Sequence, residues 1–198
     1  MALLFLGDIA TAQPVLMIGD SIFALSRGVP NHLRSAGYEI EDLSITGAKV
    51  SDIATQYRDQ NDHQSVVVMN GGGNDILSGH LVDCIKMNDK CEAVVQQVLS
   101  TAQQLVQQME SDGVQKVIYV GFYHPRGIYS GLIPAIDSGV LQIKEYCEAI
   151  SICEYIDTRD FMMPEDIWWD QLHPSASGRE KIGQAIVSSL SRHGFLPI

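Results

Sequence analysis

The chain has 198 residues, of which 45% are hydrophobic and 19% are charged, and its formal net charge is −11. This length and composition are typical of one globular domain, so we expect a single domain over residues 1–198. The basic residues form no cluster, which argues against nucleic acid or an anionic membrane as a partner, and no apolar run reaches the roughly 20 residues of a transmembrane segment.

The first residues, MALLFLGDIATAQ, contain a short apolar stretch and then Ala-Thr-Ala, which is similar to a signal-peptidase site. They lack a basic region, and Asp8 interrupts the apolar stretch. Two interpretations of residues 1–12 stay open. They are the end of a signal peptide whose start is missing, or an N-terminal extension that packs on the domain.

The run VLMI at 15–18 is continuous and apolar, as in a strand buried on both faces. It leads into Gly-Asp-Ser, and a helical pattern follows over 22–36. Ser21 therefore lies at the junction between a buried strand and a helix. A serine there is most often an N-cap that accepts a backbone N–H group. The alternative is a nucleophile, and the rest of the chain has to decide between the two.

Two more strand and helix pairs follow. A strand over 39–45 precedes TGAKV and a helix over 50–59, and a strand over 65–69 precedes NGGGNDIL. We expect residues 70–90 to be irregular. The helix over 92–111 has one apolar stripe with glutamines on the opposite face.

Four cysteines fall as two close pairs in the sequence, and none forms Cys-x-x-Cys, which argues against zinc. Four cysteines allow three pairings, of which the local one is the simplest: Cys84–Cys91 and Cys147–Cys153. These disulfides would imply an oxidising compartment. The alternative is four free cysteines, two of them buried as small hydrophobic residues.

The last strands are KVIYVGF over 116–122 and CEYID over 153–157, with helices over 134–150 and 175–193. The five alternations of strand and helix predict a parallel sheet covered by helices on both faces, which is a three-layer αβα sandwich. Ligands bind such sheets at the carboxyl ends of the strands.

Residues suited to acyl transfer follow these strands. Ser21 can act as a nucleophile once His173 accepts its proton, and Asp170 can orient and stabilise the imidazole. The N–H groups of Ser21 and Gly47 and the side-chain amide of Asn74 can stabilise an oxyanion. Gly47 alone is most often a turn residue, and Asn74 is most often part of a loop. Their joint occurrence after successive strands favours the catalytic interpretation.

The chain resembles the SGNH hydrolases, also called the GDSL esterase/lipase family, in four blocks: Gly-Asp-Ser at 19–21, Gly47, Gly-Gly-Asn-Asp at 72–75, and Asp-x-x-His-Pro at 170–174. The resemblance implies a flavodoxin-like five-stranded sheet, no metal or cofactor, and ester or thioester hydrolysis through an acyl-enzyme on Ser21. In size and in GGGNDIL the chain is similar to the small bacterial thioesterase–lysophospholipase branch.

The loop FYHPRGIYSGLIP occupies the position of the substrate loop in that branch. The candidate substrate-binding side chains are Phe23, Tyr123, Ile128, Tyr129 and Trp169. The alternative is that the loop residues only pack the loop onto the domain.

We expect a serine esterase with the triad Ser21, His173 and Asp170 that acts on a small or lipid-derived ester of short-to-medium acyl length. A carbohydrate O-acetyl esterase on the same fold is the enzymatic alternative. A non-catalytic binding module is the other, but every residue needed for catalysis is present. The disulfides favour a periplasmic or secreted protein.

Overall fold

Five parallel strands form the central sheet of the computed structural model, which describes residues 14–60 and 64–197. The strands are β1 (Val15–Ile18), β2 (Ile40–Asp42), β3 (Val66–Met69), β4 (Lys116–Val120) and β5 (Cys153–Ile156). Their order is β2-β1-β3-β4-β5, and every pairing is parallel. This confirms the predicted sheet, and the order is that of flavodoxin-like folds.

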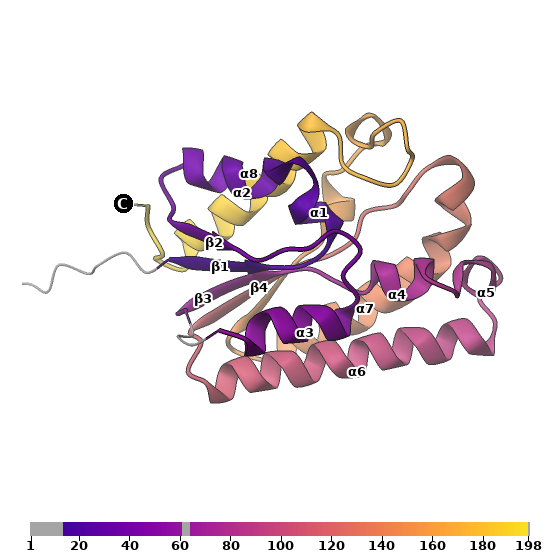
Figure 1. Ribbon diagram of the computed structural model, residues 1–198, viewed down its shortest axis with the longest axis horizontal. Coiled ribbons are helices and arrows are strands. Elements are labelled where there is room, and N and C mark those ends of the chain that lie inside the picture. The colour runs from indigo at the N-terminus through magenta and orange to yellow at the C-terminus, as the bar shows by residue number, and fades with distance from the viewer. Residues whose placement is uncertain (1–13, 61–63, 198) are drawn as a thin grey trace, which may run out of the picture.

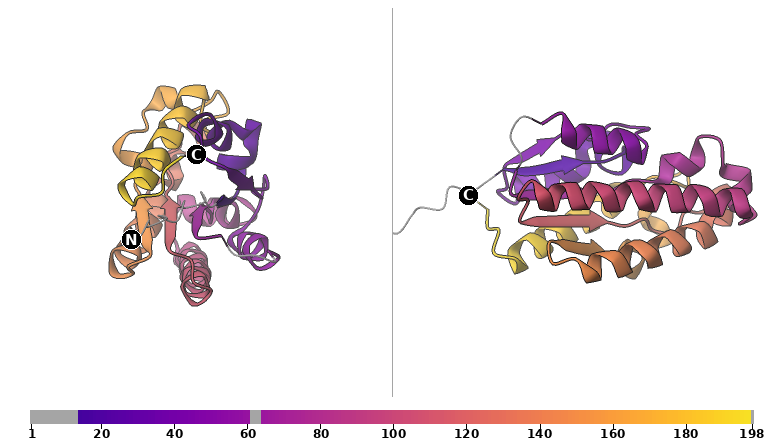
Figure 2. Two further views of the ribbon diagram at one scale, coloured as in Figure 1. Left: turned by 90° about the vertical axis from the view of Figure 1, so that its left-hand side faces the viewer. Right: turned by 90° about the horizontal axis from the view of Figure 1, so that it is seen from below.

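Helices cover both faces of the sheet and complete the three-layer sandwich (Figure 1 and Figure 2). One face carries α1 (Ser21–Ala24), α2 (Gly28–Ser35) and α8 (Ala176–Arg192). The other carries α3 (Val50–Arg58), α6 (Asp89–Ser111) and α7 (Ile133–Ala149). At the carboxyl end of the sheet lie α4 (Gly73–Leu77), α5 (Leu81–Ile85) and a 3₁₀ segment (Gly127–Leu132).

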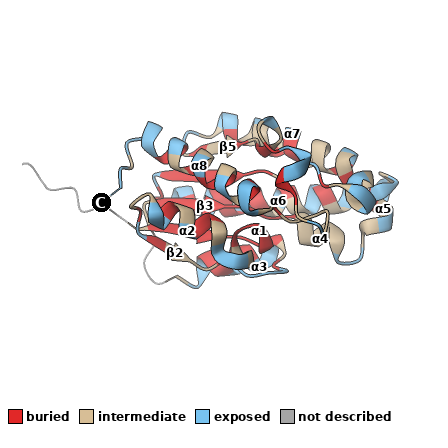
Figure 3. Cartoon of the chain, turned by 90° about the horizontal axis from the view of Figure 1, so that it is seen from above, coloured by how far each residue is buried: buried red, intermediate tan, exposed pale blue. Residues whose placement is uncertain are grey.

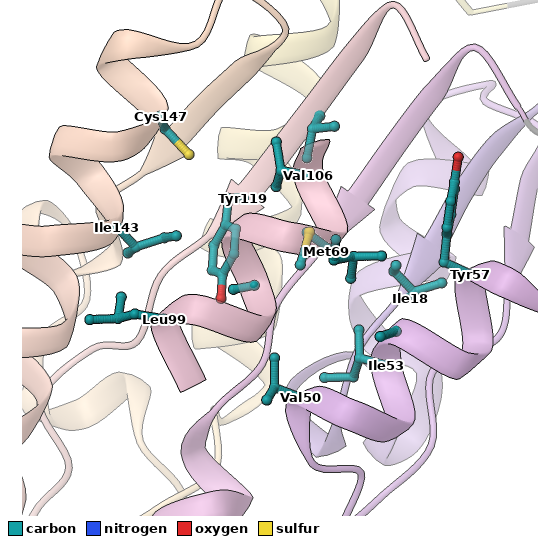
Figure 4. Close-up of a cluster of buried hydrophobic side chains, with 14 of the residues drawn as sticks. Ile18, Val50, Ile53, Tyr57, Met69, Leu99, Val106, Tyr119, Ile143 and Cys147 are labelled. Carbon is teal, nitrogen blue, oxygen red and sulfur yellow. The ribbon is translucent and has the colours of Figure 1, made fainter. Parts of the chain in front are cut away.

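The sheet separates two hydrophobic cores, which explains why the strands β1 and β3 are apolar without alternation. Leu16 and Ile18 of β1 pack in a cluster with α3, α6 and α7, while Val15 and Met17 pack in a second cluster with α2 and α8. Figure 3 shows the strands as the most continuously buried part of the chain. The first cluster, drawn in Figure 4, borders the functional site described below.

The single helix predicted over 22–36 is two helices. A 3₁₀ segment over Leu25–Arg27 separates α1 from α2, and Ser26 and Arg27 have φ angles of 55° and 51°. Pro30 has no N–H group, so it cannot donate to the carbonyl of residue 26 as an uninterrupted helix would require. The guanidinium of Arg27, at this break between the helices, forms an ion pair with the carboxylate of Asp42.

The segment over 70–90 is also more regular than predicted, because it contains α4 and α5. Helix α6 begins at Asp89, three residues earlier than predicted. Asn88 is its N-cap, and the Asn88 side-chain oxygen accepts from the N–H groups of Lys90 and Cys91 at 3.1 and 3.2 Å. An N-cap asparagine satisfies N–H groups that lack partners within the helix.

Both predicted disulfides are formed. Cys84–Cys91 joins α5 to the first turn of α6, and Cys147–Cys153 joins the end of α7 to β5. Over residues 14–60 and 64–197, none of the helices combines the length and the hydropathy of a transmembrane segment. The two interpretations of residues 1–12 lie outside the described residues.

Candidate active site

Ser21 is the buried first residue of α1, directly after the turn that ends β1. The N-cap of this helix is Asp20, whose carboxylate accepts a hydrogen bond from the Ile22 N–H group at 3.0 Å. Asp20 therefore has the capping role that serine often has at such a junction. The hydroxyl of Ser21 is left to interact with another partner.

Two buried amide side chains hold the turn before Ser21. Gln56 of α3 accepts from the Gly19 N–H group at 2.8 Å and donates to the Gly19 carbonyl at 3.1 Å. Asn70, directly after β3, accepts from the Asp20 N–H group at 3.2 Å and donates to the Asp20 carboxylate at 2.7 Å. Burial raises the pKa of Asp20 against these hydrogen bonds. A Cβ on Gly19 would lie 1.9 Å from the Asn70 oxygen, so the turn requires glycine.

Ser21, His173 and Asp170 form a chain of hydrogen bonds. His173 Nε2 lies 2.9 Å from Ser21 Oγ, and His173 Nδ1 lies 2.7 Å from Asp170 Oδ2. A carboxylate only accepts, so in the neutral ring Nδ1 carries the proton and Nε2 accepts from the serine hydroxyl. Burial favours a higher pKa for Asp170, but the N–H groups of His173 and Leu172, each at 3.0 Å, and the imidazole hold that pKa below its usual value.

A tight turn carries the imidazole. The Trp168 N–H group donates to the His173 carbonyl at 2.7 Å, and Gln171 has a φ angle of 68° and donates to the Trp168 carbonyl at 3.0 Å. The Arg126 guanidinium donates to the carbonyls of Ile167 and Trp168 at 2.8 and 3.1 Å. The segment before α7 therefore fixes the turn in place from outside.

Asn74 of α4 lines the same cavity as Ser21 and His173. One of its two amide hydrogens is donated to the Ala48 carbonyl at 3.0 Å. This bond joins α4 to the loop that contains Gly47, whose φ angle of +84° favours glycine. Gly47 is exposed and belongs to the rim of an adjacent groove rather than to the cavity itself.

An apolar cavity of about 110 Å³ opens beside Ser21 and His173. Helices α4, α6 and α7 supply most of its wall, and Tyr119 and Tyr155 supply the wall on the side of the sheet. Figure 4 shows Tyr119 next to Leu99 of α6 and Ile143 of α7. The aliphatic lining is formed by Ile22, Ile76, Leu77, Val95, Val98, Leu99, Ala102, Leu132, Ala135, Ile136, Val140, Ile143 and Leu172.

Of the five side chains predicted to contact substrate, Tyr123 lines this cavity. The other four do not line it. Phe23 is wholly buried in the core shared with α2 and α8, because residues two apart on a helix point in nearly opposite directions. Tyr129 packs against the first cluster, on the side of the sheet covered by α6 and α7, and Ile128 and Trp169 are exposed.

Sequence reasoning missed two groups of residues. Gln56 lies among apolar neighbours on α3, and Asn70 directly follows a buried strand. Polar side chains are uncommon at such buried positions, so both could have indicated a functional role. The cavity walls could not be predicted, because the apolar residues of α6 and α7 form the same pattern as an ordinary core-facing stripe.

His124 does not join the Ser21 site. It lies 2.7 Å from Asp137, and the Arg159 guanidinium lies 2.6 Å from the same carboxylate. Burial favours a higher pKa for Asp137, but these two partners lower it.

Across the described parts of the chain, no group of three or more His, Cys, Asp or Glu side chains is placed to hold a metal ion.

The family model described as GDSL-like lipase/acylhydrolase matches residues 17–181. Among similar solved structures, an acetylxylan esterase from Geobacillus stearothermophilus is 18% identical with a TM-score of 0.70, over 93% of this chain and 96% of that one. A putative acylhydrolase from Bacteroides fragilis is 18% identical with a TM-score of 0.69, over 91% and 87%. A lipase from a goat rumen metagenome is 17% identical with a TM-score of 0.64, over 89% and 96%. A search of curated proteins found no match. The three structures share the fold of this chain.

Proposed function

The chain belongs to the GDSL-like lipase/acylhydrolase family and is a carboxylic ester hydrolase, and we propose that Ser21 is its nucleophile. The observation that carries this proposal is the chain of hydrogen bonds from Asp170 through His173 to Ser21 at the mouth of an apolar cavity. A nucleophile, a base and a residue that orients the base are what acyl transfer requires.

In the first half-reaction, Ser21 Oγ attacks the carbonyl carbon of the ester while His173 Nε2 takes the hydroxyl proton. Asp170 stabilises the imidazolium that forms. The negative charge on the carbonyl oxygen is stabilised by the N–H groups of Ser21 and Gly47 and by the Asn74 amide. When the intermediate collapses, the bond to the alcohol breaks and His173 donates its proton to the leaving oxygen.

In the second half-reaction, a water molecule takes the place of the alcohol. His173 removes its proton as the water oxygen attacks the acyl-enzyme carbonyl. The bond to Ser21 Oγ then breaks, and Oγ recovers the proton from Nε2. The carboxylic acid leaves, and no cofactor takes part in these steps.

The cavity supports an acyl group of short-to-medium length. Ser21 follows β1, and two strands further across the sheet Gly121 follows β4 and lines the same cavity. Two strand spacings are about 10 Å, which suits a chain of hexanoyl to octanoyl length. Each buried methylene contributes about 0.8 kcal/mol, or about fourfold in kcat/KM. Thioesters of these acids are substrates of the same chemistry.

A carbohydrate O-acetyl esterase is the second candidate. An open groove of about 560 Å³ lies beside Gly47, and polar side chains of Thr46, Asp52 and Thr55 line it. Such a groove suits a polyhydroxylated alcohol portion better than a lipid. An acetyl group would then occupy only the mouth of the apolar cavity.

A graded ester panel tests the proposal. We expect kcat/KM for p-nitrophenyl esters to rise from acetyl through butyryl to hexanoyl by as much as two orders of magnitude, to be highest at hexanoyl or octanoyl, and to fall at palmitoyl. Strong acetate release from acetylated xylan with negligible hexanoyl hydrolysis would favour the second candidate. Absence of turnover on every ester and thioester would favour a binding module.

We also propose that the protein is periplasmic or secreted. The support is the presence of two disulfides, because such bonds persist in oxidising compartments. Fractionation of the native host tests this, and a purely cytoplasmic protein would contradict it.

A further inference from the structure

Several large apolar side chains are exposed at the end of the molecule that carries the active site. Val82 and Ile85 of α5 are 62% and 42% exposed, Ile128 of the 3₁₀ segment is 76% exposed, and Trp169 is 82% exposed. Figure 3 shows α5 as an exposed element at this end. We refer to these four side chains as the apolar rim.

Contacts between the elements make the rim continuous. Ile85 packs against Gly131 of the 3₁₀ segment. The N–H group of Ile128 donates to the side-chain oxygen of Gln171 at 3.0 Å. Gln171 and Trp169 belong to the tight turn that carries His173. The rim therefore extends from α5 to the catalytic turn, and Leu132 of the 3₁₀ segment and Leu172 of the turn line the apolar cavity.

The rim is unusual in its charge. The chain has 24 acidic and 13 basic residues, yet residues 127–136, GIYSGLIPAI, contain neither. Val82 is next to Asp83 on α5, Lys86 directly follows that helix, and Trp169 is followed by Asp170, so the rim has no cluster of either sign. A net charge of −11 is repelled by anionic surfaces, so a rim without a basic cluster suits a neutral or zwitterionic surface.

We propose that the apolar rim docks the enzyme on the surface of aggregated neutral or zwitterionic lipid esters. This inference rests on the proposed function. Apolar side chains that insert below the headgroups hold a protein at an interface without spanning it. A docked rim places the cavity mouth against the lipid, so that an acyl chain passes from the aggregate into the cavity without crossing water.

The binding test uses the Ser21→Ala protein, so that its result does not depend on hydrolysis. We expect it to co-sediment with phosphatidylcholine vesicles, and phosphatidylglycerol added to the vesicles should weaken binding. Trp168 is half-buried under the Arg179 guanidinium, 5.3 Å from its ring, whereas Trp169 is free to insert. A blue shift of tryptophan fluorescence should therefore accompany binding.

Adding Val82→Ser and Ile128→Ser together to the Ser21→Ala protein should weaken its binding to vesicles at least tenfold. The matched control adds Leu141→Ser and Leu196→Ser, which removes two apolar side chains that are 57% and 66% exposed elsewhere. The control should bind as the parent does. In the active enzyme, the rim variant should lose hydrolysis of micellar esters relative to monomeric p-nitrophenyl butyrate.

Three results would overturn the proposal: no binding of the parent to phosphatidylcholine, equal losses in the rim and control variants, or a dimer that dissociates when the rim is changed. The last would assign the rim to a second copy of the chain. Vesicle binding by the rim without hydrolysis of any ester would instead refute the proposed function and leave docking intact.

Discussion

Gln56 and Asn70 position the nucleophile, although neither touches it. Their four hydrogen bonds to Gly19 and Asp20 join the turn before Ser21 to α3 on one side and to β3 on the other. Because all of these groups are buried, the loss of any of these hydrogen bonds would lower the stability of the folded protein. The turn is thus rigid before substrate binds, as an oriented nucleophile requires.

The change Gln56→Met should show this. It leaves the Gly19 N–H group buried without a partner, at about 1–3 kcal/mol, while the Gly19 carbonyl keeps the hydrogen bond that it accepts from the Ile45 N–H group at 3.0 Å. We expect a loss of about 1–3 kcal/mol in the free energy of unfolding, measured in urea, and a fall in kcat larger than any rise in KM. Gln104→Met at an exposed position of α6 is the control and should change neither. A loss below 1 kcal/mol with normal kcat would contradict the positioning role.

Asp170 sets the tautomer of His173. In Asp170→Asn, the amide can donate to Nδ1, which would move the ring proton to Nε2 and prevent it from accepting from Ser21. We expect kcat/KM at pH 7 to fall about 10³–10⁴-fold. A fall of less than tenfold would mean that another group orients the imidazole.

The pH profile follows from the lowered pKa of Asp170. Its carboxylate stays ionised far below neutral pH, so kcat/KM of the unchanged enzyme should rise only once towards neutral pH, when the catalytic base becomes deprotonated. The stability that the carboxylate contributes is present above its ordinary pKa of about 4. It is lost as the pH falls through the lowered pKa of the folded protein. A rate that is flat from pH 5 to 8 would point to another base.

At the scale of elements, α7 sets the size of the acyl site. Gly139 lies inside this helix and lines the cavity, and a Cβ there would meet only Val95, at 3.8 Å. Gly139→Ala should therefore stabilise the protein by about 0.5–1 kcal/mol. Gly139→Leu should fill the cavity and lower the ratio of hexanoyl to acetyl kcat/KM at least tenfold. An unchanged ratio in the leucine variant would place the acyl chain elsewhere.

The disulfides connect elements that are close in sequence. With sequence separations of 7 and 6 residues, each should contribute about 2.5 kcal/mol by the chain-entropy estimate. Reduction should lower the Tm by about 10 °C or more and leave the protein folded at 25 °C. Peptide mapping without reductant should find both local pairs. Four alkylatable thiols in the native protein would contradict them.

For the whole molecule, sequence patterns predicted the layers and the main elements well, because continuous apolar strands and striped helices have strong periodic signals. They also placed Ser21, Asn74 and His173 at one edge of the sheet, since parallel strands end together. Helix breaks and short helices could not be predicted, because they depend on local hydrogen bonding that hydrophobic periodicity does not describe. Pro30 divides a helix, and the short helices α4 and α5 lie where glycines and polar residues indicated a loop.

The acyl site was the largest feature that the sequence did not reveal. Its walls come from segments far apart in the chain, and the residues that line it also belong to an ordinary hydrophobic core. The apolar residues of the loop at 123–133 led us to expect that this loop contacts the substrate. In the structure Tyr123 and Leu132 are buried and line the cavity, and Tyr129 packs against the core. Ile128 is exposed, which is why we assign Ile128 to docking instead of acyl binding.

The central claim is that Ser21 forms the acyl-enzyme. Intact-protein mass spectrometry after treatment with a fluorophosphonate tests it most directly, with peptide mapping to locate the adduct. We predict one covalent adduct, on Ser21, together with loss of p-nitrophenyl ester hydrolysis, and no adduct on the Ser21→Ala protein. An adduct on another residue, or full ester hydrolysis by Ser21→Ala, would contradict the account.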